Sequence, residues 1–301
     1  EENNYHPLRI TSVKTPPDPP TNLRWEALDD DTDGITDDIT WKESRNANAN
    51  LSSPDNLKLR AAWDPPKDPS EVTDYYIQIA TSETFTKKSI IKEEWIAKPV
   101  PSIAFNDDFS AAGISAANWP TNAPPFINTS KYAFFEGASV SNKSLISKEL
   151  NLGGTYNDYN YARLNFNINY DSSDSNDSLK FGILSYDTAS STWVDDQLAE
   201  WSDTKEVWQH KTYILSNYIG KKIKLYFKVN ADNALTNPKI GIDNVKLTIE
   251  QNCYPFQGVD QTIYYFRLVS KNGAGFSKPV SITDSYRSYF STGKGDTIGT
   301  N

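Results

Sequence analysis

The chain has 301 residues, enough for two ordinary domains. Aromatic residues make up 13% of it and Asn, Asp, Ser and Thr are frequent, a composition typical of short strands joined by polar turns. Its net charge of −9, without a basic stripe, predicts no nucleic-acid partner and no docking on an anionic membrane, but is compatible with Ca²⁺ binding. One Cys excludes an intramolecular disulfide. The lack of Met predicts a chain that is processed or cut from something longer, and the lack of any apolar run near ~18 residues predicts no membrane span.

The N-terminal residues 1–22 are polar and rich in proline, and they are predicted to form an extended linker. Beyond them, helical signals are nearly absent. Short segments alternate apolar and polar residues, as antiparallel strands with one solvated face do. One such segment contains Leu57, Leu59, Ala61 and Trp63 at alternate positions and ends at Pro65-Pro66. An all-β fold is therefore expected.

The same alternation returns near the other end of the chain. Tyr264, Phe266 and Leu268 fall on one face of a predicted strand, and Asn272-Gly273-Ala274-Gly275 then turns the chain into a hairpin. The front half of this pattern ends near residue 100 and the back half resumes near Asn252. A structureless loop of that length between neighbouring strands is implausible, so a second domain is predicted between the two halves.

The outer segments resemble a fibronectin type III domain. The resemblance implies an immunoglobulin-like sandwich formed by residues 23–102 and 251–290, followed by a tail over 291–301. It also implies that Trp63 lies in the core and that Tyr264 closes a corner against the preceding loop. The residues that carry it are Pro19-Pro20 before Asn22-Leu23, Trp63-Asp64-Pro65-Pro66, Asp74-Tyr75-Tyr76-Ile77, and Val259 to Leu268 followed by Asn272-Gly273-Ala274-Gly275.

The predicted insert, residues 103–250, opens with Phe105-Asn106-Asp107-Asp108-Phe109 and ends with Gly241-Ile242-Asp243-Asn244-Val245. The order of its segments resembles jelly-roll domains grouped with MAM-type receptor modules, bacterial surface anchor-associated domains and carbohydrate-binding modules. The resemblance implies a second, concanavalin-like sandwich whose first and last strands pair, so that its ends lie side by side as insertion requires. It also implies core positions for Trp119, Trp193 and Trp208.

Acidic residues near both ends of the insert indicate a structural Ca²⁺ site. Asp107 and Asp108 lie in its first predicted strand and Asp243 in its last, so their carboxylates converge if those strands pair. Glu136, at the end of its own strand, is a further candidate ligand, because Ca²⁺ takes about six to eight oxygens. The alternative is that Asp243 caps a turn while Asp107 and Asp108 are solvated.

A second acidic segment precedes Gly34. Asp29, Asp31 and Asp33 alternate as in a D-x-D-x-D-G calcium loop, and Asp37 fits a later ligand position. However, Thr40 stands where an EF-hand has its bidentate Glu, and no helix is predicted on either side. The alternative is an acidic, hydrated surface turn.

Exposed aromatic rings are the third candidate, as a platform for sugars. Trp and Tyr rings can lie against the apolar faces of sugar rings while polar neighbours bind the hydroxyls. Trp201 lies in a polar stretch typical of a loop, and Tyr156, Tyr159 and Tyr161 cluster in another. The alternative is that these aromatic residues simply suit strands and sheet edges.

Catalysis is not expected, because the two His residues, His6 and His210, lie far apart and no G-x-S-x-G, phosphate-loop or H-E-x-x-H motif is present. The sequence favours a non-catalytic, secreted or cell-surface module. It is expected to act as a structural or adhesive part of a surface appendage or envelope layer that contacts other copies or surface proteins. The alternative is a carbohydrate-binding module that binds glycans and is carried on a fibronectin type III spacer.

Overall fold

The computed structural model describes residues 15–27, 58–111, 114–122, 126–128, 132–136, 143–154, 159–171, 177–202, 205–230, 239–257 and 264–282. These residues are mostly β-strands, joined by turns and by one 3-10 helix, η2 (Ser216–Tyr218), so the all-β prediction is confirmed. Within them, no helix has the length and apolar character needed to cross a membrane.

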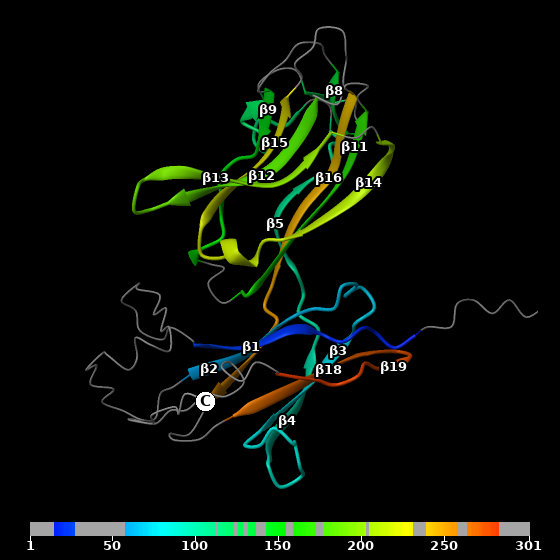
Figure 1. The fold of residues 1–301 in the computed structure, drawn as a ribbon, viewed down its shortest axis with the longest axis vertical. Coiled ribbons are helices and arrows are strands. Elements are labelled where there is room, and N and C mark those ends of the chain that lie inside the picture. The colour runs from blue at the N-terminus through cyan, green and yellow to red at the C-terminus, as the bar shows by residue number, and fades with distance from the viewer. Residues whose placement is uncertain are drawn as a thin grey trace, which may run out of the picture. The chain divides into compact units, whose positions relative to one another are not determined.

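The chain divides into two compact units (Figure 1). The discontinuous unit lies within residues 1–99 and 252–301, and the inserted unit comprises residues 100–251. The insert predicted at 103–250 thus begins three residues later and ends one residue earlier than the structural unit.

Two antiparallel sheets form the discontinuous unit. Strands from before and after the insert pair directly, because β17 pairs with β2 and β18 with β3. One sheet has the order β1 (Thr21–Ala27), β2 (Lys58–Asp64), β17 (Cys253–Gln257). The other has the order β19 (Gly275–Phe276), β18 (Tyr265–Asn272), β3 (Asp74–Ala80), β4 (Ile90–Ala97), with β20 (Val280–Ser281) also on β18.

The core of the discontinuous unit follows from the alternation in its strands. Tyr75, Ile77 and Ile79 of β3 are fully buried, and so is Trp63, whose ring centre lies 5.2 Å from that of Tyr75. Burying an apolar side chain of this size stabilises a fold by about 1.5–3 kcal/mol. The predicted core position of Trp63 is confirmed, and Tyr264 is buried as well.

The proline-rich N-terminal segment is part of this unit from Thr15 onward. The backbone carbonyl of Asp18 accepts a hydrogen bond from Ser270 Oγ (2.6 Å), and that of Thr15 accepts one from Asn272 Nδ2 (2.8 Å). Both donors are buried and need partners. The predicted linker, residues 1–22, was therefore too long at its C-terminal end, because β1 already begins at Thr21.

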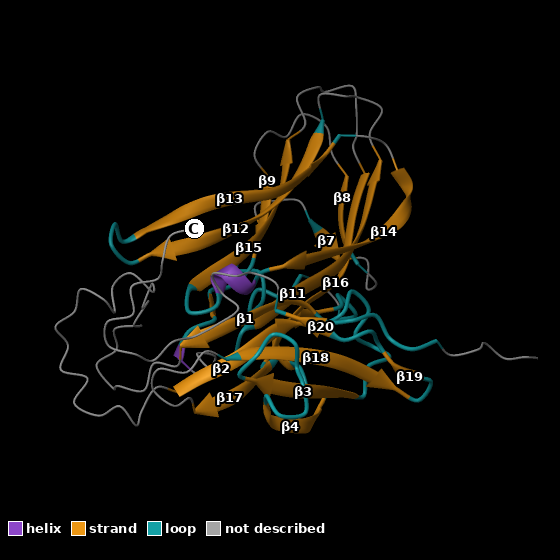
Figure 2. Cartoon of the chain, turned by 60° about the horizontal axis from the view of Figure 1, so that its bottom comes forward, coloured by secondary structure: helices purple, strands orange, loops and turns teal. Residues whose placement is uncertain are grey.

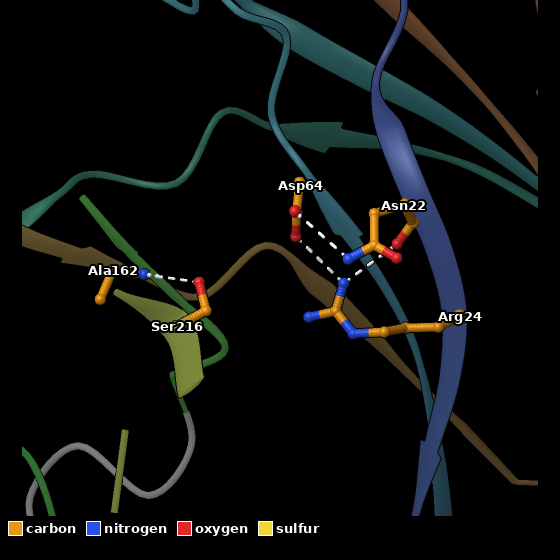
Figure 3. A network of polar contacts seen from close by, with 5 residues as sticks. All are labelled: Asn22, Arg24, Asp64, Ala162 and Ser216. Carbon is orange, nitrogen blue, oxygen red and sulfur yellow. Dashed lines mark hydrogen bonds and ion pairs between the residues drawn. The ribbon is translucent and has the colours of Figure 1, made fainter. Parts of the chain in front are cut away.

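Polar contacts also fasten β1 to β2 (Figure 3). Asp64 accepts hydrogen bonds from Arg24 Nη1 (3.0 Å) and Asn22 Nδ2 (3.3 Å). The side chains of Arg24 and Asp64 are 16% and 20% exposed, so solvent screens this pair less than an ordinary surface ion pair. Within the inserted unit, Ser216 Oγ accepts a hydrogen bond from the backbone of Ala162 (3.2 Å), which holds η2 against the start of β11.

The inserted unit also has two antiparallel sheets, visible as separate groups of strands in Figure 2. Its first and last strands pair, with Asp107 opposite Val245, as predicted. The first sheet has the order β14 (Lys205–Ile214), β11 (Tyr161–Asp171), β16 (Lys239–Glu250), β8 (Ala133–Glu136), β7 (Ile127–Asn128), with β5 (Ser102–Asp107) also on β16. The second has the order β13 (Thr192–Trp201), β12 (Ser178–Asp187), β15 (Lys222–Asn230), β9 (Lys143–Ile146), β6 (Thr121–Asn122), with β10 (Leu150–Asn151) also on β15.

Strand β11 shows how the inserted unit separates its core from its outer surface. Its even-numbered residues from Leu164 to Tyr170 are buried, whereas the intervening residues are partly exposed. Phe166 packs in the core against Phe181 and Phe227, with ring centres 4.8 and 5.1 Å from its own. The same alternation places four polar side chains of β11 on the outer face of the first sheet: Asn165, Asn167, Asn169 and Asp171.

Candidate functional site

A cavity of about 270 Å³ opens on the outer face of this first sheet. Its walls come from β8, β11, β14 and β16, and from the residue just before β8. The register places Gly241 opposite both Asn169 and Phe134, and Lys239 opposite Asp171. The sheet thus brings residues distant in sequence to one place. The lining residues are Tyr132, Phe134, Asn169, Asp171, Trp208, Lys239 and Gly241.

Three aromatic residues line the cavity, Tyr132, Phe134 and Trp208, and Trp208 is 41% exposed. A Cβ atom at Gly241 would lie only 2.7 Å from Cη2 of the Trp208 ring, so the ring rests directly on the β16 backbone. Only glycine permits this close approach. Tyr132 and the Trp208 ring pack edge to face, with centres 5.2 Å apart and planes at 73°. Trp208 is therefore held in place while part of its surface remains open to solvent.

Three polar side chains complete the cavity. Asn169 carries an amide that both donates and accepts, Asp171 is an acceptor when ionised, and Lys239 is a donor. The two charges are opposite, so the lining has no net charge. A fixed aromatic ring beside a few polar groups suits a ligand that has both apolar C–H faces and hydroxyl groups.

The aromatic residues predicted as a sugar platform are partly or fully used in packing where the structure describes them. Trp201 is half-buried at the end of β13 and packs edge-on against Phe166 in the core. Tyr161 is only 4% exposed, and Tyr159 is half-buried against the core with its Oη 3.0 Å from Ser102 Oγ. The prediction for Tyr161 is wrong because its ring is buried in packing, whereas Trp201 and Tyr159 are partly buried and stay predictions. Tyr156 lies outside the described residues.

Conversely, the expected core position of Trp208 is wrong. Its neighbours at two-residue spacing, His210 and Thr212, are polar, and all three lie on the exposed side of β14, whereas Tyr213 packs on the core. This alternation was the available signal in the sequence. Trp193 is also not fully buried: it lies on β13 with Lys224 Nζ 4.2 Å from its ring centre. Trp119, at 1% exposure, is in the core as predicted.

Asp107, a predicted Ca²⁺ ligand, accepts hydrogen bonds from three protein donors. Its Oδ2 accepts hydrogen bonds from Trp119 Nε1 (2.9 Å) and Asn118 Nδ2 (3.0 Å), and its Oδ1 accepts one from the backbone of Phe109 (2.9 Å). Hydrogen bonds to an ionised carboxylate are stronger than neutral ones. Asp107 therefore secures the buried Trp119, which packs against Phe105 and Phe109.

Asp108 and Asp243, two more of the predicted ligands, accept hydrogen bonds from residues close to them in the chain. Asp108 Oδ1 accepts hydrogen bonds from Ser110, which lower the pKa of Asp108. Asp243 binds the backbone and side chain of Asn244. Burial raises the pKa of Asp243, opposed by the backbone hydrogen bond from Asn244 and reinforced by the carboxylate of Asp108.

Among the described residues, no group of three His, Cys, Asp or Glu side chains could hold a metal ion. Ca²⁺ takes about six to eight oxygens, and the Ca²⁺ site predicted from Asp107, Asp108, Glu136 and Asp243 stays a prediction. The side chain of Glu136 lies outside what the structure describes, and so do Asp29, Asp31, Asp33 and Asp37 of the acidic segment.

No protein-family model and no curated protein matches the chain. Among solved structures, it is similar to the K3 cleaved adhesin domain of Lys-gingipain from Porphyromonas gingivalis (19% identity, 50% of this chain, 99% of that one, TM-score 0.32). It is also similar to the CBM22-2 xylan-binding domain of Paenibacillus barcinonensis Xyn10C (16% identity, 48% and 98% coverage, TM-score 0.29). A third likeness is to the C-terminal family 22 carbohydrate-binding module of Clostridium thermocellum Xyn10B (13% identity, 50% and 94% coverage, TM-score 0.30). At this identity and TM-score, these likenesses assign no function to the chain.

Proposed function

We propose that the chain is a non-catalytic, extracellular binding module whose inserted unit recognises a glycan in the Trp208 cavity. One observation carries the proposal: the Trp208 ring is seated on the backbone at Gly241, 41% exposed, beside Asn169 and Asp171. Because the ring is already fixed, a ligand avoids much of the entropy cost of ordering a flexible side chain, about 0.5–1.5 kcal/mol.

The chemistry of the lining favours a neutral sugar over a charged ligand. The Asp171 carboxylate and the Lys239 ammonium balance each other, so neither an anion nor a cation meets a uniform field. The cavity, about 270 Å³, is slightly smaller than typical drug-binding pockets of about 300–1,000 Å³. Amide, carboxylate and ammonium groups around one ring can bind hydroxyls in several directions while the ring covers a C–H face.

The discontinuous unit is proposed to act as a fibronectin type III-like spacer that presents the inserted unit. Its strand order, β1-β2-β17 in one sheet and β19-β18-β3-β4 in the other, supports this interpretation. On this proposal the protein belongs outside the cell or on its surface, where it contributes to adhesion by binding glycans. Other copies of the chain or surface proteins are further proposed partners.

A glycan array with two matched variants tests the proposal. Trp208→Ala removes the ring, and Trp95→Ala removes a comparably exposed Trp, at 47%, from β4 of the other unit. We expect wild type and Trp95→Ala to bind the same glycans, and Trp208→Ala to lose at least ~10-fold in affinity, equivalent to about 1.4 kcal/mol. Unchanged binding by Trp208→Ala, or no bound glycan at all, would overturn the proposal.

A further inference from the structure

The outer face around the Trp208 cavity carries three consecutive rows of side chains on β11 and β16, and the register of β14 continues the second and third rows. The first row, Asn169 with Gly241, lines the cavity together with Trp208. Successive rows are two residues apart along β11 and β14, about 6.6 Å, and on β16 the register shift puts Lys246 three residues after Asp243. The register pairs that define the rows are Asn169 with Gly241, Asn167 with His210 and Asp243, and Asn165 with Thr212 and Lys246.

The second and third rows hold their polar groups in fixed positions. His210 Nδ1 lies 3.0 Å from Asn167 Oδ1, and Thr212 Oγ1 donates to Asn165 Oδ1 at 2.8 Å. Thr212 Oγ1 also lies 3.4 Å from His210 Nε2, which links the two rows. Each of these Asn side chains is bonded here through its oxygen, and its amide nitrogen carries two further donors.

The rows are accessible to a ligand. His210 and Thr212 are exposed on β14, and Asn165 and Asn167 are partly exposed on β11. The pairing of β11 shifts register next to these rows: with β16 between Asn165 and Asn167, and with β14 just after Ile168. Such irregularities re-aim side chains and are common beside binding sites.

The rows are also balanced in formal charge. Asp243 in the second row is offset by Lys246 in the third, just as Asp171 is offset by Lys239 in the cavity. A neutral chain with many hydroxyls would meet donors and acceptors along the whole face without facing a dominant charge. From the row of Asn169 to the row of Asn165 the distance is about 13 Å, which exceeds a single sugar ring.

We propose that the binding site continues from the Trp208 cavity along β11 and β14 as a polar lane formed by Asn167, His210, Asn165 and Thr212. Its ligand is therefore a neutral oligosaccharide rather than a single sugar. This inference rests on the proposed glycan-binding function of the same cavity. Trp208 provides the apolar subsite, and the lane binds the hydroxyls of the following sugar units.

Calorimetric titration with sugars of two lengths tests the lane separately from the cavity. The probes are xylose, glucose and mannose, with xylohexaose, cellohexaose and mannohexaose. For at least one pair, the wild type is expected to bind the hexaose at least ~10-fold more tightly than the monosaccharide. His210→Ala and Thr212→Val should remove most of this gain and leave monosaccharide affinity within about two-fold of wild type, because they change only the lane.

The outcomes separate the two proposals. Equal affinity for a hexaose and its monosaccharide, or a hexaose preference that survives both lane variants, overturns the lane and leaves the cavity proposal standing. Wild-type binding by Trp208→Ala overturns the proposed function and the lane with it, as does the absence of binding to all six sugars. The Thr212→Val side chain is nearly isosteric, so its result stands even if His210→Ala is found by melting temperature to disturb β14.

Discussion

Replacing Asp107 by Ala is expected to destabilise the inserted unit strongly, because one carboxylate binds three donors. The substitution removes the acceptors of Trp119 Nε1, Asn118 Nδ2 and the Phe109 backbone. A hydrogen bond to a charged group contributes about 1.5–3 kcal/mol, and a buried donor left without a partner costs about 1–3 kcal/mol. Trp119 is only 1% exposed, so water cannot readily replace its partner. Since these terms overlap, the expected loss is about 3 kcal/mol.

Thermal unfolding followed by near-ultraviolet circular dichroism measures this loss. For a unit of about 150 residues, each 1 kcal/mol lowers the melting temperature by about 2–4 °C, so a fall of roughly 6–12 °C is expected. Asp108→Ala is the matched control: the neighbouring carboxylate is exposed and accepts its hydrogen bonds from Ser110, so its removal should change the melting temperature much less.

A calcium chelator distinguishes this explanation from a shared metal site. If Asp107 acts through protein donors, the chelator should not reproduce the effect of Asp107→Ala. Equal losses for Asp107→Ala and Asp108→Ala, together with an equal loss on chelation, would refute the reasoning and favour a Ca²⁺ ion bound by both carboxylates.

Three further predictions follow from particular contacts. Gly241→Ala places a methyl group against the Trp208 ring, where a Cβ would lie 2.7 Å from Cη2. Glycan affinity measured by calorimetry should fall at least ~5-fold, while circular dichroism should show that the fold is retained. Unchanged affinity would contradict the contact between the ring and Gly241. Burial and a hydrogen bond to Asp195 raise the pKa of Tyr226, so the stability that this group confers is present below the ordinary Tyr pKa near 10 and is lost as pH rises above it. In urea titrations, Tyr226→Phe should therefore lose less stability than wild type between pH 9 and about 11.5. An identical loss would argue against the shift. A chain that starts at residue 21 should melt several degrees below one that starts at Thr15, because it lacks the carbonyls that accept hydrogen bonds from buried Ser270 and Asn272. Equal melting temperatures would show that this segment does not stabilise the sandwich.

Much of the architecture could be predicted because it depends on local patterns and on loop length. The alternation around Trp63 and Tyr264 identifies strands, and the interval between them is too long for a structureless loop, which requires an inserted domain. The pairing of the first and last strands of the insert was also predictable, and it brings Asp107 opposite Val245.

The candidate site could not be predicted because it depends on pairing between strands that are distant in sequence. The alternation of Trp208 with His210 shows that the ring is on the polar face of β14. However, its seat on Gly241 depends on how β14, β11 and β16 are aligned, and no local pattern encodes that register. The polar neighbours of Trp201 indicate a loop, yet Trp201 ends β13 and packs on Phe166 of β11. This contact, too, joins strands that are distant in sequence.

Asp107 illustrates the same limit for polar groups. The sequence identifies the carboxylate and its place on the first strand of the insert, but an acidic side chain can bind a metal or protein donors equally well. In the structure, Asn118 and Trp119 lie close to β5 and donate hydrogen bonds to Asp107, and this contact cannot be read from the residue type. Side-chain type alone therefore does not distinguish the two roles in a chain that carries 39 acidic residues.

The most direct test of the central claim is a titration of ¹⁵N-labelled protein with the best-bound oligosaccharide, followed through the indole N–H signals of its eight Trp residues. Trp208→Phe assigns the signal of Trp208, and Trp95→Phe assigns that of Trp95. We predict that saturation shifts the Trp208 signal and leaves the Trp95 signal in place. A glycan that binds while the Trp208 signal stays unchanged would contradict the claim that this cavity is the binding site.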